Sequence, residues 1–152
     1  MNSPLRGRSV NLWRGIRFRI PGFDGPESGP GGGLGISPQG RLEAVSGRAA
    51  VRQALLLLLT TRPGERVMRP RYGCELSRLM FWPNDDTTAG LAIHYVQRAV
   101  ARWEPRVDHL RVDAHPRPDR PGVLDVTLAY RVRSTGEEDR LAIRVDLGSG
   151  AV

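Results

Sequence analysis

The sequence predicts an α+β fold in which two main helices pack on one face of a C-terminal three-stranded antiparallel meander. Residues 107–152 alternate apolar and polar side chains with the period of two that half-buried strands show. Two earlier stretches repeat apolar side chains every three or four residues, which is typical of helices. The chain contains 18 Gly and 12 Pro, which predicts long irregular segments. We therefore expect residues 1–43 to form an irregular Gly/Pro-rich N-terminal arm with a flexible loop, and residues 44–152 a single α+β domain.

The predicted arm contains one strand pattern and one loop pattern. Ile16, Phe18 and Ile20 alternate with arginines, as in a short half-buried strand. Residues 24–40 are dominated by Gly, Pro and Ser, so we expect them to form a flexible loop. A phosphate-binding loop would need Gly-Lys-Ser/Thr after a hydrophobic strand, and neither feature is present in this part of the sequence.

Helical patterns occupy the middle of the chain. The first helix is expected at residues 47–60, and the five leucines at 55–59 predict that it is buried nearly all round. Residues 75–81 are expected to form one or two helical turns. Residues 84–87 (Asn-Asp-Asp-Thr) supply N-cap candidates for a second helix that runs to about Trp103. The polar, largely basic outer side of that helix carries His94, Gln97, Arg98 and Arg102.

Three strands are predicted after this helix, joined by two polar loops. Each strand directs its apolar side chains to one side, and the helices must cover that side. The apolar side chains are, strand by strand, Leu110, Val112 and Ala114; Leu124, Val126, Leu128, Tyr130 and Val132; Leu141, Ile143, Val145 and Leu147. Packing of the helices against this face is expected to be the main source of stability.

Two Glu-Arg elements adjoin the most apolar helical stretches. They are Glu65-Arg66, after Pro63-Gly64, and Glu104-Pro105-Arg106. Charges at such places are expected to lie near the core and to need partners. Proline disfavours the helical conformation in the residue before it, so Glu104 is expected to leave the helix at a rigid corner. Two interpretations remain open: Glu104 is satisfied within the domain by Arg106 or Arg66, or the corner is offered to another subunit.

The charge of the chain limits its function without deciding it. All 23 basic residues are Arg, against 16 acidic residues, which gives a formal charge of +7. Such a surface suits nucleic acid, an acidic protein partner or an assembly rich in ion pairs, although GC-rich coding alone gives the same composition. Trp13, Trp82 and Trp103 are not interleaved with arginines as a base-stacking platform requires, so nucleic-acid binding is an alternative rather than the main hypothesis.

Catalytic and metal-binding patterns are missing from the sequence. The single Cys74 excludes an internal disulfide and a cysteine-built zinc site, and the three histidines lack metal-ligand spacing. Glu65 and Glu104 could act as the carboxylate pair of a glycoside hydrolase, but each has an arginine within two residues that favours a structural ion pair. We therefore predict no enzyme, no cofactor and no metal. No secretory signal or membrane span is recognisable, so a soluble protein that starts in the cytoplasm is expected.

Several motifs in a fixed order resemble one protein family. The similarity covers about residues 13–147, including R-G-I-R-F near the start and the closing meander. The motifs are T-R-P-G-E-R (61–66), V-M-R-P-R-Y-G (67–73), L-M-F (79–81) and W-E-P-R (103–106). In this set and spacing the chain resembles the small baseplate wedge protein of contractile phage tails, which type VI secretion baseplates and extracellular contractile injection systems share.

The resemblance implies a noncatalytic subunit present in six copies around the inner tube. It implies that Glu104, Pro105 and Arg106 help to lock the protein to the core bundle of the larger wedge subunits. It also implies a meander similar to the domain through which sheath subunits join, so the strands at 124–132 and 141–147 are expected to offer an edge to the sheath protein. The residues assigned to that contact are Leu124, Val126, Leu128, Leu141, Ile143 and Val145. The structural motif that precedes the second helix comprises Pro63, Gly64, Glu65, Arg66, Pro70 and Gly73.

These expectations define a function and two alternatives. The main hypothesis is a structural baseplate component that joins the wedge to the first sheath ring and initiates sheath assembly, with the inner tube or hub as a further partner. It is made in the cytoplasm of the producing bacterium and is incorporated in the baseplate, without contact with a membrane or a specific nucleic acid. The alternatives are a nucleic-acid-binding protein and a peptidoglycan hydrolase, because the family is also described as lysozyme-like. The sequence leaves open whether the particle is a phage, a type VI machine or a free injection particle.

Overall fold

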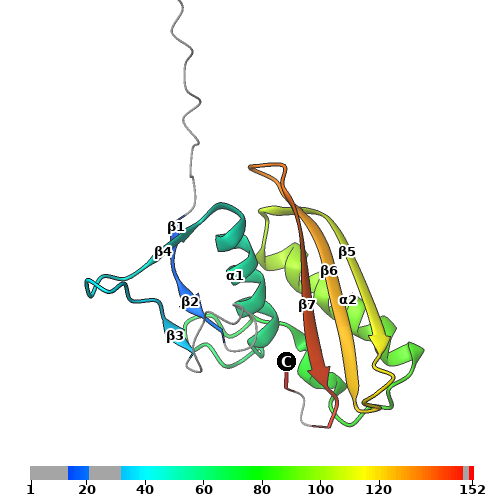
Figure 1. The fold of residues 1–152 in the computed structure, drawn as a ribbon. Coiled ribbons are helices and arrows are strands. Elements are labelled where there is room, and N and C mark those ends of the chain that lie inside the picture. The colour runs from blue at the N-terminus through cyan, green and yellow to red at the C-terminus, as the bar shows by residue number, and fades with distance from the viewer. Residues whose placement is uncertain (1–13, 21–31, 149–150) are drawn as a thin grey trace, which may run out of the picture. The chain divides into compact units, whose positions relative to one another are not determined.

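The computed structural model describes residues 14–20, 32–148 and 151–152 (Figure 1). Contacts divide the chain into two units, residues 1–50 and 51–152. This division falls inside the first helix and does not test which parts fold by themselves. The domain boundary between residues 43 and 44 therefore stays a prediction.

The N-terminal unit contains four short strands in two antiparallel pairs. They are β1 (Arg14–Ile16), β2 (Phe18–Arg19), β3 (Gly33–Leu34) and β4 (Ala44–Ser46). β1 pairs with β4, and β2 pairs with β3. The Arg17 N–H, between the first two strands, donates to the Glu43 carbonyl at 2.7 Å. The strand predicted at residues 16–20 is thus two short strands. Of the predicted loop, residues 24–31 lie outside the described residues, and part of the remainder forms β3.

The predicted helices are present, and only the short stretch predicted at 75–81 ends earlier, at Leu79. α1 is Gly47–Thr60, a 3-10 helix follows at Glu75–Leu79, and α2 is Asp86–Trp103. Asp85 is the N-cap of α2, because its carboxylate accepts a hydrogen bond from the Thr88 N–H at 2.9 Å. In the described parts of the chain no helix is long and apolar enough to cross a membrane.

The C-terminal sheet has the order β5-β6-β7, with β6 in the centre and both pairs antiparallel. Its strands are β5 (Val107–Pro116), β6 (Val123–Val132) and β7 (Glu138–Asp146). Figure 1 shows α2 lying along the sheet. The fold-class prediction of two helices and an antiparallel three-stranded meander is confirmed. One detail departs from simple alternation, because β5 carries a register shift between Asp108 and Arg111.

The core of the second unit combines helix and strand side chains. Leu55, Leu58 and Leu59 of α1 are fully buried, as are Leu76 and Leu79 of the 3-10 helix. The buried apolar side chains of the sheet are Val107, Val112, Ala114, Leu124, Val126, Leu128, Tyr130, Val132, Leu141, Ile143, Val145 and Leu147. Burial of this face is what fixes the register, since a slip by one residue would expose every one of these side chains.

Candidate functional site

Residues 61–74, here called the turn segment, form a closed loop between α1 and the 3-10 helix. The Gly64 N–H donates to the Pro70 carbonyl at 2.8 Å, and the Cys74 N–H donates to the Thr61 carbonyl at 2.9 Å. Gly64 has φ +98° and Gly73 has φ +130°, conformations that favour glycine. A Cβ at Gly73 would lie 2.4 Å from the Thr61 carbonyl oxygen, so only glycine fits there. The glycines of the sequence motif are thus explained by backbone geometry.

Glu104 and Arg106 form a bidentate ion pair at the end of α2. The Arg106 Nε and Nη2 each lie 2.5 Å from a Glu104 carboxylate oxygen. Glu104 is 5% exposed, whereas the Arg106 side chain is 23% exposed and Pro105 is exposed. The hydrogen bond to Glu104 raises the pKa of Arg106, although burial acts in the opposite direction. Of the two interpretations of this corner, the intramolecular pair is the one that this chain forms by itself.

Tyr72 connects the turn segment to this corner. Its ring packs edge-on against Trp103 with the centroids 5.5 Å apart, and the Arg66 guanidinium lies 4.4 Å from the centroid of the Tyr72 ring. Burial raises the pKa of Tyr72 despite the nearby Arg66. The structure therefore brings together two motifs that are separated by about thirty residues, through an aromatic contact that the sequence pattern did not indicate.

The second Glu-Arg element does not lie near the core. Glu65 and Arg66 are both exposed. The Glu65 carboxylate accepts a hydrogen bond from the Arg62 N–H at 3.0 Å, within the same turn. The expectation that both Glu-Arg elements are buried is thus wrong for Glu65-Arg66, because the turn segment carries these residues away from the core.

The outer edge of β7 can be deduced from the hydrogen bonds of its ends. In an antiparallel pair each residue directs both main-chain groups to the same side, and neighbouring residues alternate. The Leu147 N–H donates to the Gly122 carbonyl, and the Glu137 carbonyl accepts from the Val132 N–H. The main-chain N–H and C=O groups of the odd-numbered residues of β7 therefore point towards β6. The main-chain groups of Arg140, Ala142, Arg144 and Asp146 point away from the sheet, and we call them the β7 edge.

Both ends of the β7 edge are occupied within the chain. At one end, the Arg52 guanidinium donates to the Arg140 carbonyl at 2.7 Å, and the Arg140 N–H donates to the Asp139 carboxylate at 2.8 Å. At the other end, the Asp146 N–H donates to the Ala151 carbonyl at 2.8 Å. Among the described residues no partner is found for the main-chain groups of Ala142 and Arg144. These two residues form the open part of the edge.

The carboxylate at the closed end is held by several donors. The Tyr130 hydroxyl donates to Asp139 at 2.9 Å, and Arg52 lies 3.3 Å from the same oxygen. Burial by itself would raise the pKa of Asp139, but the hydrogen bonds from Tyr130 and the Arg140 N–H, together with Arg52, lower it overall. Burial and the bond to Asp139 raise the pKa of Tyr130. This cluster fixes the start of β7 against α1.

The opposite edge, on β5, is interrupted at both ends. His109 has φ +49° in the bulge between Asp108 and Arg111, which interrupts the regular spacing of donors and acceptors. At the other end, Pro116 has no N–H to donate. Bulges and prolines at edges are the features by which proteins prevent strand addition.

The structure corrects one part of the strand prediction. Residues 124–132 cannot offer an edge, because β6 is the central strand and is paired on both sides. The six apolar side chains assigned to the sheath contact, Leu124, Val126, Leu128, Leu141, Ile143 and Val145, are all buried in the core. Alternation identified the strands but carried no information on their order in the sheet. A strand can be added to this sheet only beside β5 or β7, its two outer strands.

The F-W-P stretch after the 3-10 helix forms an exposed turn. Phe81 has φ +65° and is 79% exposed, and its N–H donates to the Leu147 carbonyl at 2.7 Å. A left-handed backbone at a bulky residue costs about 1–2 kcal/mol and persists only where the surroundings hold it.

Cys74 is free and buried, and burial raises its pKa to about 11. In residues 14–20, 32–148 and 151–152 no group of three His, Cys, Asp or Glu side chains is arranged to hold a metal ion.

The sequence profile of one family matches more than half of the chain. That family is described as baseplate wedge protein gp25, and the match covers residues 45–137. The chain belongs to the gp25 baseplate wedge family. The matched region contains α1, the turn segment, α2 with its Glu-Pro-Arg corner, and the first two strands of the sheet. The resemblance inferred from the ordered motifs is confirmed.

Proteins that are similar to this chain agree with this assignment. The baseplate wedge protein gp25 of Enterobacteria phage T4 is 34% identical over 87 residues, which is 57% of this chain and 62% of the T4 protein, less than two thirds of its length. A crystal structure from Geobacter sulfurreducens, described as a candidate tail lysozyme, is 38% identical with a TM-score of 0.60 and covers 64% of this chain and 88% of that one. A chain in the baseplate of the anti-feeding prophage is 27% identical with a TM-score of 0.61, and the match covers 66% of this chain and 80% of that one. The gp25 family thus includes parts of contractile injection machines.

Proposed function

We propose that this protein is a structural subunit of a contractile injection baseplate that joins the wedge to the first sheath ring and initiates sheath assembly. The observation that carries this proposal is the β7 edge, where Ala142 and Arg144 have main-chain groups without a partner among the described residues. A strand of the sheath protein added there would gain main-chain hydrogen bonds with little demand on sequence. The bulge and Pro116 of β5 interrupt the opposite edge at both ends, which makes β7 the favoured side for such addition.

The occupied ends of the β7 edge set the extent of this contact. Arg52 and Asp139 close the edge at Arg140, so an incoming strand begins its pairing beyond that residue. Ala151 occupies the Asp146 N–H, so a longer strand has to replace the C-terminal residues. The free chain therefore cannot pair with a second copy of itself along the whole edge. A short strand can still form hydrogen bonds with the N–H and C=O groups of two residues, Ala142 and Arg144.

The Glu-Pro-Arg corner is the contact that we propose for the core bundle of the larger wedge subunits. Pro105 fixes the backbone, and Glu104 fixes the orientation of the Arg106 guanidinium through two hydrogen bonds. Partner groups would then meet the exposed Pro105 ring and the exposed part of Arg106 in one prearranged geometry, which reduces the entropy lost on binding. Six copies per particle, around the inner tube or hub, belong to the same proposal.

Catalysis is not part of this function. Both carboxylate oxygens of Glu104 are bound by Arg106, and Glu65 is exposed and hydrogen-bonded within its own turn. An acid–base pair for glycoside hydrolysis needs two carboxyl groups that can reach the substrate, and both oxygens of Glu104 are already hydrogen-bonded to Arg106. We propose that the protein is made in the cytoplasm of the producing bacterium and acts within the assembled particle.

A proline substitution in β7 tests the role of its edge. Ala142→Pro removes an N–H that points away from the sheet, so the ladder with β6 keeps all its bonds and the protein folds. Ala142→Ser is the matched control, since it keeps that N–H. Producing cells that lack the gene are complemented with each variant, and their particles are examined by negative-stain electron microscopy. We expect full sheaths with Ala142→Ser and unsheathed baseplates with Ala142→Pro. Full sheaths with a folded Ala142→Pro protein would refute the proposal.

A further inference from the structure

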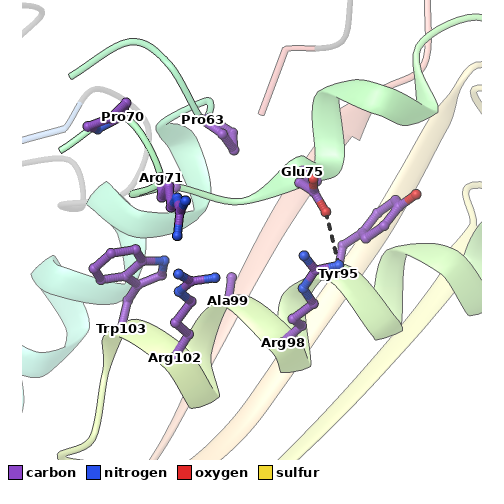
Figure 2. Close-up of a pocket in the computed structure, with 10 residues that line it drawn as sticks. Pro63, Pro70, Arg71, Glu75, Tyr95, Arg98, Ala99, Arg102 and Trp103 are labelled. Carbon is purple, nitrogen blue, oxygen red and sulfur yellow. Dashed lines mark ion pairs between the residues drawn. The ribbon is translucent and has the colours of Figure 1, made fainter. Parts of the chain in front are cut away.

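The outer side of α2 and the turn segment line an open hollow of about 310 Å³, which neither of the two proposed partner contacts uses. Arg98 and Arg102 line it from α2, and Arg71 lines it from the turn segment. Pro63, Pro70 and Trp103 supply apolar walls. Figure 2 shows that Arg71 and Arg102 point into the same space from these two separate segments. We call this hollow the arginine pocket.

The charges in the arginine pocket are unbalanced. Its one acidic residue, Glu75, lies 3.2 Å from Arg78 and 3.5 Å from Arg98, so its charge is already shared by two arginines. Neither Arg71 nor Arg102 has an ion pair in the described part of the chain. Two guanidinium groups that point into the same space repel each other. An anion between them would offset this repulsion, because it would form a charge-assisted hydrogen bond with each guanidinium group.

The walls of the pocket favour a carboxylate on a peptide over a nucleic acid. Planar guanidinium groups match carboxylates in bidentate geometry. Base stacking would need an open aromatic face, but the Arg102 guanidinium lies 5.3 Å from the centroid of the Trp103 ring and Tyr72 packs against the same ring. The volume is at the lower end of the roughly 300–1,000 Å³ of ligand pockets, which suits one or two side chains and not a phosphate backbone.

We propose that the arginine pocket binds an aspartate or glutamate side chain in an acidic segment of a protein partner. Arg71 and Arg102 bind the carboxylate, Arg98 is held in position by Glu75, and the proline and tryptophan walls contact the neighbouring residues of the segment. This surface differs from both the β7 edge and the Glu-Pro-Arg corner. It therefore adds a third contact, independent of the proposed attachment to the sheath.

The test uses the full chain, a blocked hexaglutamate peptide and NMR spectroscopy of the backbone amides and arginine Nε–H groups. Peptide binding should shift the resonances of Arg71, Arg98 and Arg102 and leave the β7 edge unchanged. Arg71→Gln/Arg102→Gln should weaken binding about tenfold, as loss of charge-assisted bonds predicts. Arg120→Gln/Arg133→Gln is the matched control, because it removes the same charge from two exposed arginines elsewhere and should change the affinity less than about twofold.

Several outcomes would overturn the proposal. One is no shift of the pocket arginines at about 5 mM hexaglutamate, beyond the range of a specific weak contact. A second is an equal loss of peptide affinity in the two double variants, which would show that only the net charge of the protein matters. A third is that hexaglutamine binds with the same affinity as hexaglutamate. Tighter binding of a thymidine hexanucleotide that depends on Arg71 and Arg102 would show a nucleic-acid site instead. None of these outcomes depends on sheath assembly, so failure here and failure of the proposed function are distinguishable.

Discussion

Removal of Arg106 should destabilise the protein more than removal of any surface arginine. In Arg106→Ala the Glu104 carboxylate, which is 5% exposed, loses both of its 2.5 Å hydrogen bonds. Breaking a buried ion pair in this way costs about 3–5 kcal/mol. Domains of this size are stable by about 5–15 kcal/mol, so the loss is a large fraction of the total. Urea denaturation followed by circular dichroism measures it directly.

Two further variants separate a buried charge from lost packing. Glu104→Gln leaves a neutral amide beside an arginine whose side chain is 23% exposed and can reach water, so it should cost about 1.5–3 kcal/mol. Glu104→Met/Arg106→Leu removes both charges and keeps the volume, so it should be more stable than Arg106→Ala alone. Arg117→Ala is the control: Arg117 lies 2.8 Å from Asp119, whose side chain is 64% exposed, so the loss should stay below about 1 kcal/mol.

Two results would contradict this explanation of the stability that the Glu104–Arg106 pair supplies. A loss below about 1 kcal/mol for Arg106→Ala, in the range of exposed ion pairs, would show that the Glu104 carboxylate is solvated. A double variant no more stable than the single one would show that shape, not charge, explains the effect. Either result would also weaken the view that Glu104 prearranges Arg106 for a partner, because that view requires the pair to be buried and rigid.

Three other predictions concern the turn segment and the residues that follow it. Gly73→Ala should cost more than about 2 kcal/mol in thermal unfolding, because its Cβ would meet the Thr61 carbonyl at 2.4 Å; an unchanged midpoint would contradict the geometry. Phe81→Gly should unfold within about 1 kcal/mol of the wild type, since it relieves a positive φ at an exposed position, whereas Leu79→Ala should cost about 2–5 kcal/mol. Burial raises the pKa of Cys74 from 9.0 to about 11, so the folded state binds the thiol proton more tightly than the unfolded state does. The contribution of this group to stability is therefore complete below pH 9 and is lost as the pH rises towards 11. Labelling of Cys74 by a disulfide reagent at pH 8 should be slow unless the protein unfolds.

Local pattern was sufficient to predict the helices of this chain. The five leucines at 55–59 and the Pro63-Gly64 break define α1, and Pro105 defines the end of α2. These signals act within one or two turns of chain, so no tertiary information is needed to interpret them. The pair at Glu104 and Arg106 was also among the interpretations left open, because proline fixes the conformation of the corner locally.

The features that escaped prediction depend on the tertiary arrangement. Alternation in β6 and β7 is the same for a central and an edge strand, so the sequence did not show that β7 lies at an edge and β6 in the centre. The register of β5 shifts between Asp108 and Arg111, where His109 has a positive φ, and the sequence analysis did not predict this bulge. The depth of Glu65 was misjudged, because apolar neighbours in sequence do not place a residue in the core. Arg71 and Arg102 meet only after the turn segment packs on α2.

The most direct test of the central claim is a cryo-electron microscopy map of the assembled baseplate with its first sheath ring, at a resolution that traces the main chain. The account predicts a fourth strand, contributed by the sheath protein, that is hydrogen-bonded to Ala142 and Arg144 on the outer side of β7. It also predicts that the bulged side of β5 carries no added strand. A map in which the β7 edge faces solvent, or in which the sheath protein contacts only side chains elsewhere on the domain, would contradict it.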